Sequence, residues 1–366
     1  MKLCIVKESR KGENRVALSP QVCAQLIKAG HEISVENGAG YASNFSDEMY
    51  AASGCTLADK KTVLQSAQVL VKVNAPDADE IQALPESAAT ISYLYATLNP
   101  ELVEQLTAKK LSAFSMDAIP RISRAQNMDA LSSQANLAGY KAVILGANHL
   151  GKIFPLLMTA AGTVSPARVL VYGAGVAGLQ AIATAKRLGA IVECTDVRPE
   201  TKEQVESLGG KFIEVKGAEA AKVEGGYAKE VSADYLQKQK EAVDKSLFQA
   251  DLVITTALVM GRKAPLLITA EQVSKMKLGA VIVDMAVEQG GNCELSVKDQ
   301  VVQQHGVTLV GVSNLPSTLP QNASELYAKN IQNLLNHLAT KDGFKFELEE
   351  DITKGTLITH QGTKRI

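Results

Sequence analysis

A short glycine-rich segment in the middle of the chain has the spacing of a phosphate-binding turn. The apolar run 169–172 is followed by Gly173-Ala174-Gly175-Val176-Ala177-Gly178, which opens the helical pattern of 179–188. In such a turn the first glycine permits a tight reversal, the second lets the backbone approach a pyrophosphate, and the third lets helix pack on strand. The helix N-terminus adds N–H donors and a positive dipole end. The pattern, with its flanking strand and helix, predicts dinucleotide binding.

An acidic residue follows the glycines at the distance that this chemistry requires. Asp196 ends the apolar run 191–195, 23 residues after Gly173. A carboxylate there accepts hydrogen bonds from the adenosine ribose hydroxyls and repels a 2′-phosphate, so the sequence predicts NAD(H) rather than NADP(H). We expect Val197 and Arg198 to contact the cofactor as well. Arg198 could weaken the discrimination, although Arg198-Pro199-Glu200 is more typical of a helix start.

A second group of functional side chains lies upstream of the glycines. The polar stretch 120–136 contains Arg121, Gln126, Asp129 and Ser132, whose side chains can bind a carboxamide and a ribose. The sequence contains no second glycine fingerprint and no Walker-type loop. One bound nucleotide is therefore expected. Its hydride must be exchanged with a small substrate, or with a second nicotinamide brought by another protein.

The elements that position these residues alternate between apolar runs and helical patterns. This alternation predicts an α/β fold of two Rossmann-like, doubly wound parallel-sheet domains separated by a cleft. The first domain is expected to comprise 1–131 together with 322–366, because the amphipathic helix 323–338 returns to it. The NAD(H)-binding domain is expected to comprise 132–321. In it, strands are predicted at 169–172, 191–195, 211–215, 252–255, 281–283 and 307–311.

Three further segments carry weaker signals. A weakly polar helix is predicted over 131–150, as a connector. Residues 217–234 lack apolar periodicity, which predicts a long surface loop of the kind that often acts as a lid. The tail 353–366 includes a possible strand at 356–359, and the sequence leaves open whether it is a docked strand or the remnant of a linker.

Composition and charge exclude several classes of protein. The formal net charge of −1 lacks the basic excess of a nucleic-acid-binding protein, so no nucleic-acid partner is expected. The five cysteines are widely spaced, which predicts reduced core thiols and no metal site. The uncharged stretches 153–167 and 169–185 are shorter than a spanning helix requires. The N-terminus lacks the pattern of a signal peptide, and a cytoplasmic location is expected.

The spacing of Arg121, Gln126 and Asp129, with Ser132 following, closely resembles the NAD(H)-binding component of the proton-translocating transhydrogenases. Nearly the whole chain shares this resemblance, which includes Lys7-Glu8 through Arg15-Val16-Ala17-Leu18-Ser19-Pro20, Gly225-Gly226-Tyr227-Ala228-Lys229-Glu230, Thr255-Thr256-Ala257-Leu258, and Val283-Asp284 through Glu288-Gln289-Gly290-Gly291-Asn292. One departure is Val259-Met260-Gly261, where the family often has Ile-Pro-Gly.

The resemblance implies specific roles and partners. Gly226 and Tyr227 would belong to a lid that closes over NAD(H), Ala257 and Leu258 would line the nucleotide channel, and Ser133 would add a cofactor contact. The activity would be that of a Re/Si-specific, proton-translocating NAD(P)+ transhydrogenase. NADP(H) would be held by a partner beta subunit, with proton translocation in a membrane-spanning subunit. A homodimer is implied, peripheral on the inner face of the cytoplasmic membrane through its partners.

Two other functions remain as alternatives. Alanine dehydrogenases share this pattern, and Arg15 and Lys72 match positions that would bind a substrate carboxylate there. Their proton-transferring histidine, however, would fall at Tyr95, and a tyrosine with a pKa near 10 is a poor base for amine oxidation. Arg15 and Lys72 are then expected to be structural. The second alternative is a non-catalytic NAD-sensing module, which would not need Arg121, Gln126 and Asp129.

Overall fold

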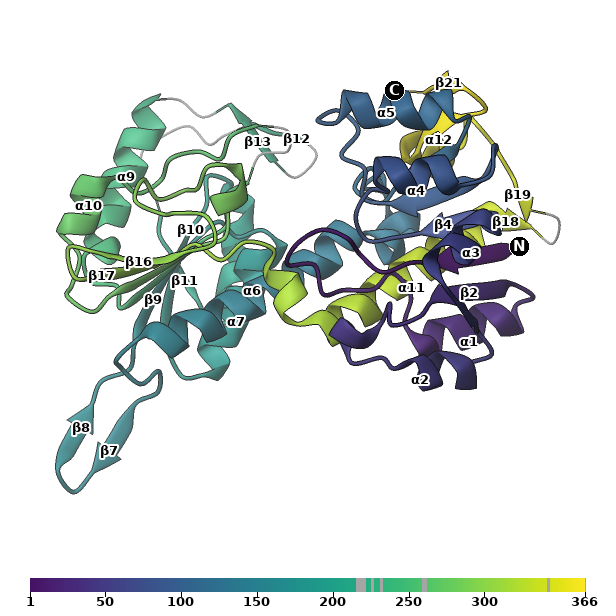
Figure 1. The fold of residues 1–366 in the computed structure, drawn as a ribbon. Coiled ribbons are helices and arrows are strands. Elements are labelled where there is room, and N and C mark those ends of the chain that lie inside the picture. The colour runs from purple at the N-terminus through teal and green to yellow at the C-terminus, as the bar shows by residue number, and fades with distance from the viewer. Residues whose placement is uncertain (215–221, 225–226, 231–232, 259–261, 341–342, 366) are drawn as a thin grey trace. The chain divides into compact units, whose positions relative to one another are not determined.

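The chain forms two compact units, each with its own sheet and core (Figure 1). The computed structural model describes residues 1–214, 222–224, 227–230, 233–258, 262–340 and 343–365. Unit 1 consists of Met1–Gln134 and Pro316–Ile366, and unit 2 of Ala135–Leu315. The first unit is therefore built from two separate lengths of chain, and the second from one.

The sheet of unit 1 has the strand order β21-β20-β6-β5-β4-β1-β2-β3. Its strands are β1 (Lys2–Ile5), β2 (Glu32–Glu36), β3 (Thr56–Ala58), β4 (Val69–Val71), β5 (Ala89–Ser92), β6 (Ser112–Ser115), β20 (Leu357–His360) and β21 (Thr363–Lys364). Strands β1 to β6 are parallel, and the order reverses between β1 and β4, as in doubly wound folds. Because β20 pairs antiparallel with β6, the tail is a docked strand.

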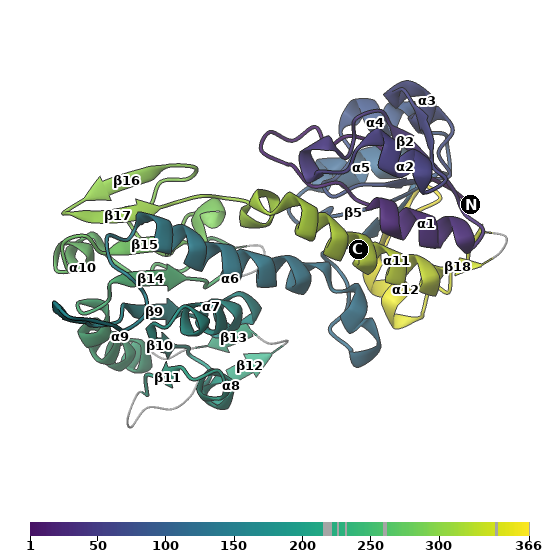
Figure 2. The same cartoon turned by 90° about the horizontal axis from the view of Figure 1, so that it is seen from below.

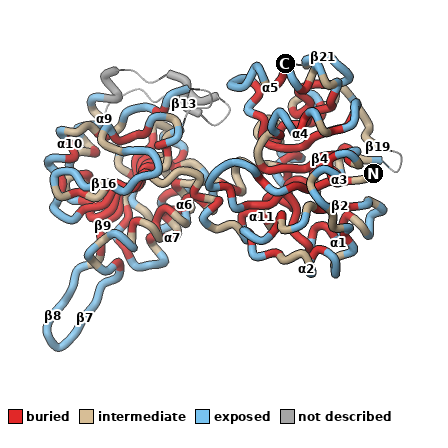
Figure 3. Tube along the Cα trace, in the orientation of Figure 1, coloured by how far each residue is buried: buried red, intermediate tan, exposed pale blue. Residues whose placement is uncertain are grey.

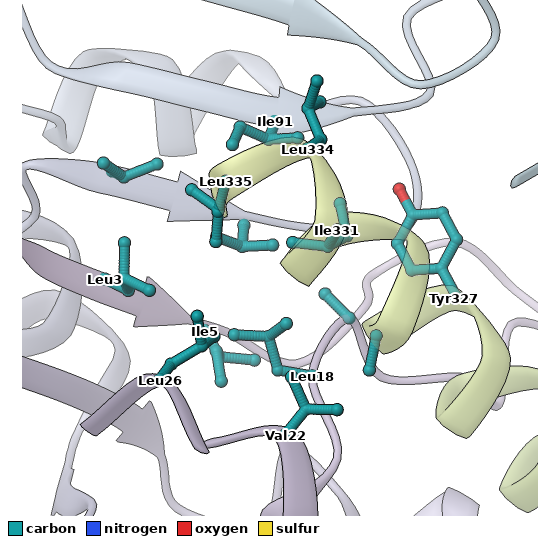
Figure 4. Close-up of a cluster of buried hydrophobic side chains, with 14 of the residues drawn as sticks. Leu3, Ile5, Leu18, Val22, Leu26, Ile91, Tyr327, Ile331, Leu334 and Leu335 are labelled. Carbon is teal, nitrogen blue, oxygen red and sulfur yellow. The ribbon is translucent and has the colours of Figure 1, made fainter. Parts of the chain in front are cut away.

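Helices cover this sheet, and the last long helix supplies much of its core. The helices are α1 (Pro20–Lys28), η1 (Tyr41–Ser43), α2 (Asp47–Ala52), α3 (Lys60–Gln65), α4 (Ala78–Ala83), α5 (Pro100–Ala108), η2 (Ser123–Met128), η5 (Leu315–Thr318), α11 (Pro320–Leu338) and α12 (Asp351–Thr356). Figure 4 shows Ile331, Leu334 and Leu335 of α11 gathered with Leu3 and Ile5 of β1. The prediction that this amphipathic helix returns to the first unit is confirmed.

Unit 2 has a second doubly wound sheet, in the order β11-β10-β9-β14-β15-β17-β16 (Figure 2). Its strands are β9 (Arg168–Tyr172), β10 (Ile191–Thr195), β11 (Lys211–Phe212), β14 (Leu252–Thr255), β15 (Val281–Asp284), β16 (Val301–Gln304) and β17 (Val307–Val310). Only β16 runs antiparallel to its neighbour among these strands. The six strands predicted from apolar runs are all present, although β11 is shorter than expected.

The helices of unit 2 are α7 (Val176–Arg187), η3 (Pro199–Thr201), α8 (Lys202–Ser207), α9 (Ala233–Leu247), α10 (Ala270–Ser274) and η4 (Val287–Gln289). Helix α6 (Ala130–His149) begins in unit 1 and continues into unit 2. Gly139 lets it approach the first turn of α7, since a Cβ there would lie 2.1 Å from the carbonyl oxygen of Ala177.

Two segments differ from expectation. The predicted loop 217–234 contains the antiparallel strands β12 (Lys222–Glu224) and β13 (Tyr227–Glu230), because strand pairing there does not depend on an apolar pattern. The uncharged stretch 153–167 forms the hairpin of β7 (Leu157–Thr159) and β8 (Gly162–Val164). Every residue of these two strands is exposed (Figure 3). Within the described part of the chain, no helix has both the length and the apolar character to cross a membrane.

Candidate functional site

The glycine fingerprint lies at the carboxyl end of β9, in the centre of the second sheet. Strands β10 and β14 flank β9, and the strand order reverses between β9 and β14. Gly175 is the N-cap residue of α7, whose first helical residue is Val176. In doubly wound sheets, ligands bind at this switch point, outside the carboxyl ends of the strands. The fold therefore places the fingerprint where a dinucleotide would bind.

Each of the three glycines has a distinct steric environment. Gly173 has a φ of +97°, and a Cβ there would lie 2.5 Å from Thr256 Oγ1. A Cβ on Gly178 would lie 1.8 Å from the carbonyl oxygen of Gly173. A Cβ on Gly175 would meet no described atom within 4 Å. The first and third glycines are therefore required by the turn itself, whereas the second faces open space in which a pyrophosphate fits.

Asp196 lies at the carboxyl end of β10, beside the fingerprint, and is buried. Its Oδ2 accepts the backbone N–H of Ala174 at 2.7 Å and Arg198 Nη2 at 2.8 Å. Its Oδ1 accepts the backbone N–H and Nε of Arg198 at 2.8 and 2.9 Å. Arg198 does precede the short helix η3, as its sequence suggested, but its guanidinium also binds Asp196. Val197 lies half-buried between them.

The turn after β14 completes the group at this edge of the sheet. Ala257 is held by the side chain of Asn292, and Leu258 is 39% exposed. Gly226 lies outside the described residues. Tyr227 begins β13, and its side chain lies outside the described part of the structure. The sequence assigned no role to Asn292, because its contact with Ala257 joins residues 35 positions apart.

The upstream residues lie in unit 1, around η2 and the first turn of α6. Asp129 caps α6: its Oδ1 accepts the backbone N–H of Ser132 at 2.9 Å, and its Oδ2 accepts the Ser132 hydroxyl at 2.5 Å. Gln126 and Arg121 are exposed. Two of the four predicted catalytic residues therefore brace the segment, while the other two present side chains to solvent within this unit.

Helix α11 supports this segment from behind. Asn330 donates Nδ2 to the carbonyl oxygen of Asn127 at 2.8 Å and accepts the Ser133 hydroxyl at 2.8 Å. The Ser133 hydroxyl also contacts the carbonyl oxygen of Ala130 at 3.1 Å. Ser133 is thus engaged by its own unit. Sequence reasoning missed Asn330, which lies 203 positions from Asn127.

Arg15 and Lys72 lie in a buried charged cluster of unit 1. Arg15 donates Nε and Nη2 to the two carboxylate oxygens of Glu13, both at 2.7 Å. Lys72 forms an ion pair of 2.7 Å with Glu80. Burial opposes the ionised form of Glu13, but hydrogen bonds and charge from Arg15 outweigh burial and lower the pKa of Glu13 to about 2. Both cations therefore have structural partners, as expected.

Tyr95 occupies the position expected for a proton-transferring histidine in alanine dehydrogenases. It has a φ of +45°, stacks on Tyr93 with ring centroids 5.7 Å apart, and is 36% exposed. The histidines lie elsewhere: His31 precedes β2, His149 ends α6, His305 lies between β16 and β17, His337 pairs with Glu350 on α11, and His360 ends β20. The described histidines therefore do not replace the missing base.

The five cysteines are all buried and free. This agrees with the expectation of reduced core thiols. The described site residues form one group in unit 2, at the ends of β9, β10 and β14, and another in unit 1, around η2.

Comparison with known proteins agrees with both halves of the chain. Residues 4–138 match the model of the N-terminal domain of alanine dehydrogenase/PNT, and residues 142–365 match the C-terminal domain of the same family. An NAD(P) transhydrogenase alpha subunit of Rhodospirillum rubrum is 51% identical, covering 99% of this chain and 97% of that protein.

A transhydrogenase structure from Sinorhizobium meliloti is similar over 100% of both chains, with 42% identity and a TM-score of 0.91. The alanine dehydrogenase of Bacillus subtilis is 31% identical over 87% of this chain and 81% of that protein. The chain thus belongs to the alanine dehydrogenase/PNT family, among its NAD(P) transhydrogenase alpha subunits.

Proposed function

We propose that the chain binds NAD(H) in unit 2 and exchanges hydride with NADP(H) held by a partner beta subunit. The observation that carries this proposal is the arrangement at one sheet edge. The fingerprint, Asp196 and the turn at Ala257 follow three neighbouring strands, at the switch point where dinucleotides bind in such sheets. The open space beside Gly175 fits a pyrophosphate.

The residues of unit 2 would bind the nucleotide and select it. The backbone N–H groups at the start of α7 face the pyrophosphate, with the positive end of the helix dipole behind them. Asp196 accepts the adenosine ribose hydroxyls after exchanging some of its contact with Arg198. Ala257 and Leu258 line the channel, and Tyr227 belongs to the lid.

The residues of unit 1 would orient the reacting end. When bound, the nicotinamide supplies or accepts hydride, a transfer that needs two aligned rings and no acid or base. Arg121 and Gln126 orient the carboxamide and ring. Asp129 and Ser132 fix the segment by capping α6, and they are available to the nicotinamide ribose. This chemistry accounts for a tyrosine at position 95.

The partners follow from the names of the relatives. An alpha subunit implies a beta subunit with NADP(H) and a membrane-spanning subunit that couples hydride transfer to proton translocation. The chain would then be peripheral on the inner face of the cytoplasmic membrane. A homodimer is supported by the β7–β8 hairpin, which exposes Leu157, Met158 and Val164 by 45%, 74% and 42%. Apolar strands of this kind are suited to pairing with a second copy of the chain.

The first test is nucleotide binding followed by turnover. NADH and NADPH are titrated into the purified chain by nucleotide fluorescence, and hydride transfer to an NADP+ analogue is assayed with and without an NADP(H)-binding domain. NADH-selective binding, with turnover only when that domain is added, is expected. Alanine-dependent NAD+ reduction by the chain alone would establish the dehydrogenase instead. Binding without turnover in any reconstitution would indicate a sensor.

Replacing Gln126 with Asn tests the role of the upstream segment. The shorter side chain would misplace the ring, so we expect hydride transfer to slow by about 100-fold, a loss of roughly 3 kcal/mol in the transition state. NADH affinity should change far less. Equal losses in both quantities would contradict the assigned role. Asn127→Asp is the matched control on the same exposed turn, since its support from α11 comes through the backbone.

A further inference from the structure

One buried side-chain amide joins two backbone segments beside the nucleotide edge of unit 2. Asn292 is fully buried. Its Oδ1 accepts the backbone N–H of Ala257 at 3.1 Å, and its Nδ2 donates to the carbonyl oxygens of Ala257 at 2.9 Å and Pro265 at 2.8 Å. The amide thus pairs with Ala257 as a neighbouring strand would, and it fastens Pro265 to the same point.

The backbone of Asn292 is itself held by a buried carboxylate. Asp284, at the end of β15, accepts the backbone N–H groups of Asn292 and Cys293 at 2.9 and 3.0 Å. It also accepts the Thr255 hydroxyl at 3.1 Å and the backbone N–H of Ala286 at 3.0 Å. Four donors therefore surround this charge, as burial requires. The ends of β14 and β15 are tied together through it.

The other side of the same turn is bound to the glycine fingerprint. The Thr256 hydroxyl donates to the carbonyl oxygens of Tyr172 at 2.9 Å and Gly173 at 3.3 Å. Ala257 follows directly, and Asn292 holds both of its backbone polar groups. The distance between the fingerprint and the channel-lining turn is consequently set by Thr256 on one side and Asn292 on the other.

We propose that Asn292 is a positioning residue of the NAD(H) site, which places Ala257 and Leu258 against the bound nucleotide. This inference rests on the proposed function, because it takes the turn to line the nucleotide channel. The role requires an amide. A carboxylate can accept from Ala257 but cannot donate to Ala257 or Pro265, and it would face two carbonyl oxygens.

The test compares Asn292→Asp with a buried-amide control. We expect Asn292→Asp to weaken NADH binding by about tenfold, measured by fluorescence titration at a temperature where the variant is folded. Gln272→Glu alters another buried amide of unit 2, which bonds Thr269 and Asp244 on α10. It should lower the melting temperature as well, yet leave NADH affinity unchanged. The control separates positioning from general loss of stability.

A second pair of variants applies if Asn292→Asp does not fold. Thr255→Val removes one hydroxyl from Asp284 without touching Asn292, and we expect about threefold weaker NADH binding. Thr255→Ser keeps the hydroxyl and should restore affinity. Unchanged NADH affinity in Asn292→Asp, or in Thr255→Val where only that variant folds, would overturn the positioning role. A wild-type chain that does not bind NADH would overturn the proposed function itself.

Discussion

At the scale of single residues, Asp196 is shared between the fingerprint and its own arginine. It accepts the backbone N–H of Ala174 and binds the Arg198 guanidinium with both oxygens. The carboxylate thus orients the glycine turn before any ribose arrives. It also occupies a cation that would otherwise be suited to a 2′-phosphate.

Asp196→Ser should therefore exchange one nucleotide preference for the other. The serine keeps little of the ribose contact and no repulsive charge, so we expect NADH affinity to fall about tenfold and NADPH affinity to rise. Both are measured by fluorescence titration. Glu193→Ser is the control, because Glu193 lies on the same strand and forms an ion pair with the exposed Lys211. Equal weakening for both nucleotides would mean that Asp196 merely supports the turn.

The residue-level predictions succeeded where a local pattern carried the information. The glycines and Asp196 lie at the predicted edge of the sheet because strand, turn and helix are continuous in sequence. The supporting contacts of Asn292 and Asn330 join distant segments, so spacing alone could not reveal them. Similarly, Asp129 and Ser132 are a helix cap, a role that their sequence spacing fits as well as it fits ribose binding.

At the scale of elements, the turn between β9 and α7 contains glycines with opposite demands. Gly178 touches the carbonyl oxygen of Gly173, whereas Gly175 has a φ of −78° that any residue can adopt. The two positions therefore separate the folding requirement of the turn from its binding requirement.

We expect Gly178→Ala and Gly175→Ala to fail in different ways. The methyl group added by Gly178→Ala has no room, so this variant should lose about 1–3 kcal/mol of stability through forced backbone movement. Gly175→Ala should keep its melting temperature but bind NADH less tightly, because its methyl group occupies pyrophosphate space. Thermal unfolding and fluorescence titration of each variant measure this. A fall in melting temperature for Gly175→Ala would contradict the assignment.

The same contrast explains which elements were predictable. Buried parallel strands such as β9 and β14 are continuous apolar runs, so their sequence is distinctive. The hairpin β7–β8 is also apolar, but its side chains are exposed, and no burial pattern marked it as strand. Short helices such as α2 and α3 are defined by their caps, Ser46 and Asp59, and offer too few turns for periodicity.

At the scale of the whole molecule, unit 1 depends on buried ion pairs and should be sensitive to acid. The pKa of Glu13 is lowered from 4.5 to about 2 in the folded chain. Its contribution to the free energy of unfolding is present above the unfolded pKa and is lost as pH falls from about 4.5 towards 2. The loss corresponds to about 3 kcal/mol.

Urea unfolding between pH 5 and 2.5 measures this loss. Glu13→Gln keeps an acceptor for Arg15 but cannot titrate, so its stability should fall less steeply over the same range. Burial raises the pKa of the neighbouring Glu8, which acts in the opposite direction and is common to both proteins. Identical slopes for the wild type and the variant would show that Glu13 does not control acid unfolding.

The proposed homodimer can be tested through the exposed hairpin. Met158→Asp places a charge on its most exposed apolar residue and should convert dimer to monomer in sedimentation experiments. Leu278→Asp alters another exposed apolar residue of unit 2 (85% exposed), outside the hairpin, and should leave the dimer intact. A wild-type chain that is monomeric at micromolar concentration would refute the dimer, and an unchanged Met158→Asp dimer would exclude the hairpin.

The discontinuous course of the chain governs the order in which its units are completed during synthesis. Unit 1 needs α11 for its core and β20 to cover the edge of β6, and both come from residues beyond 315. All of unit 2 leaves the ribosome before them. Because domains fold as units as they emerge, the unit that is begun first is finished last. Its unfinished apolar face has to be kept from aggregating while the whole of unit 2 is translated.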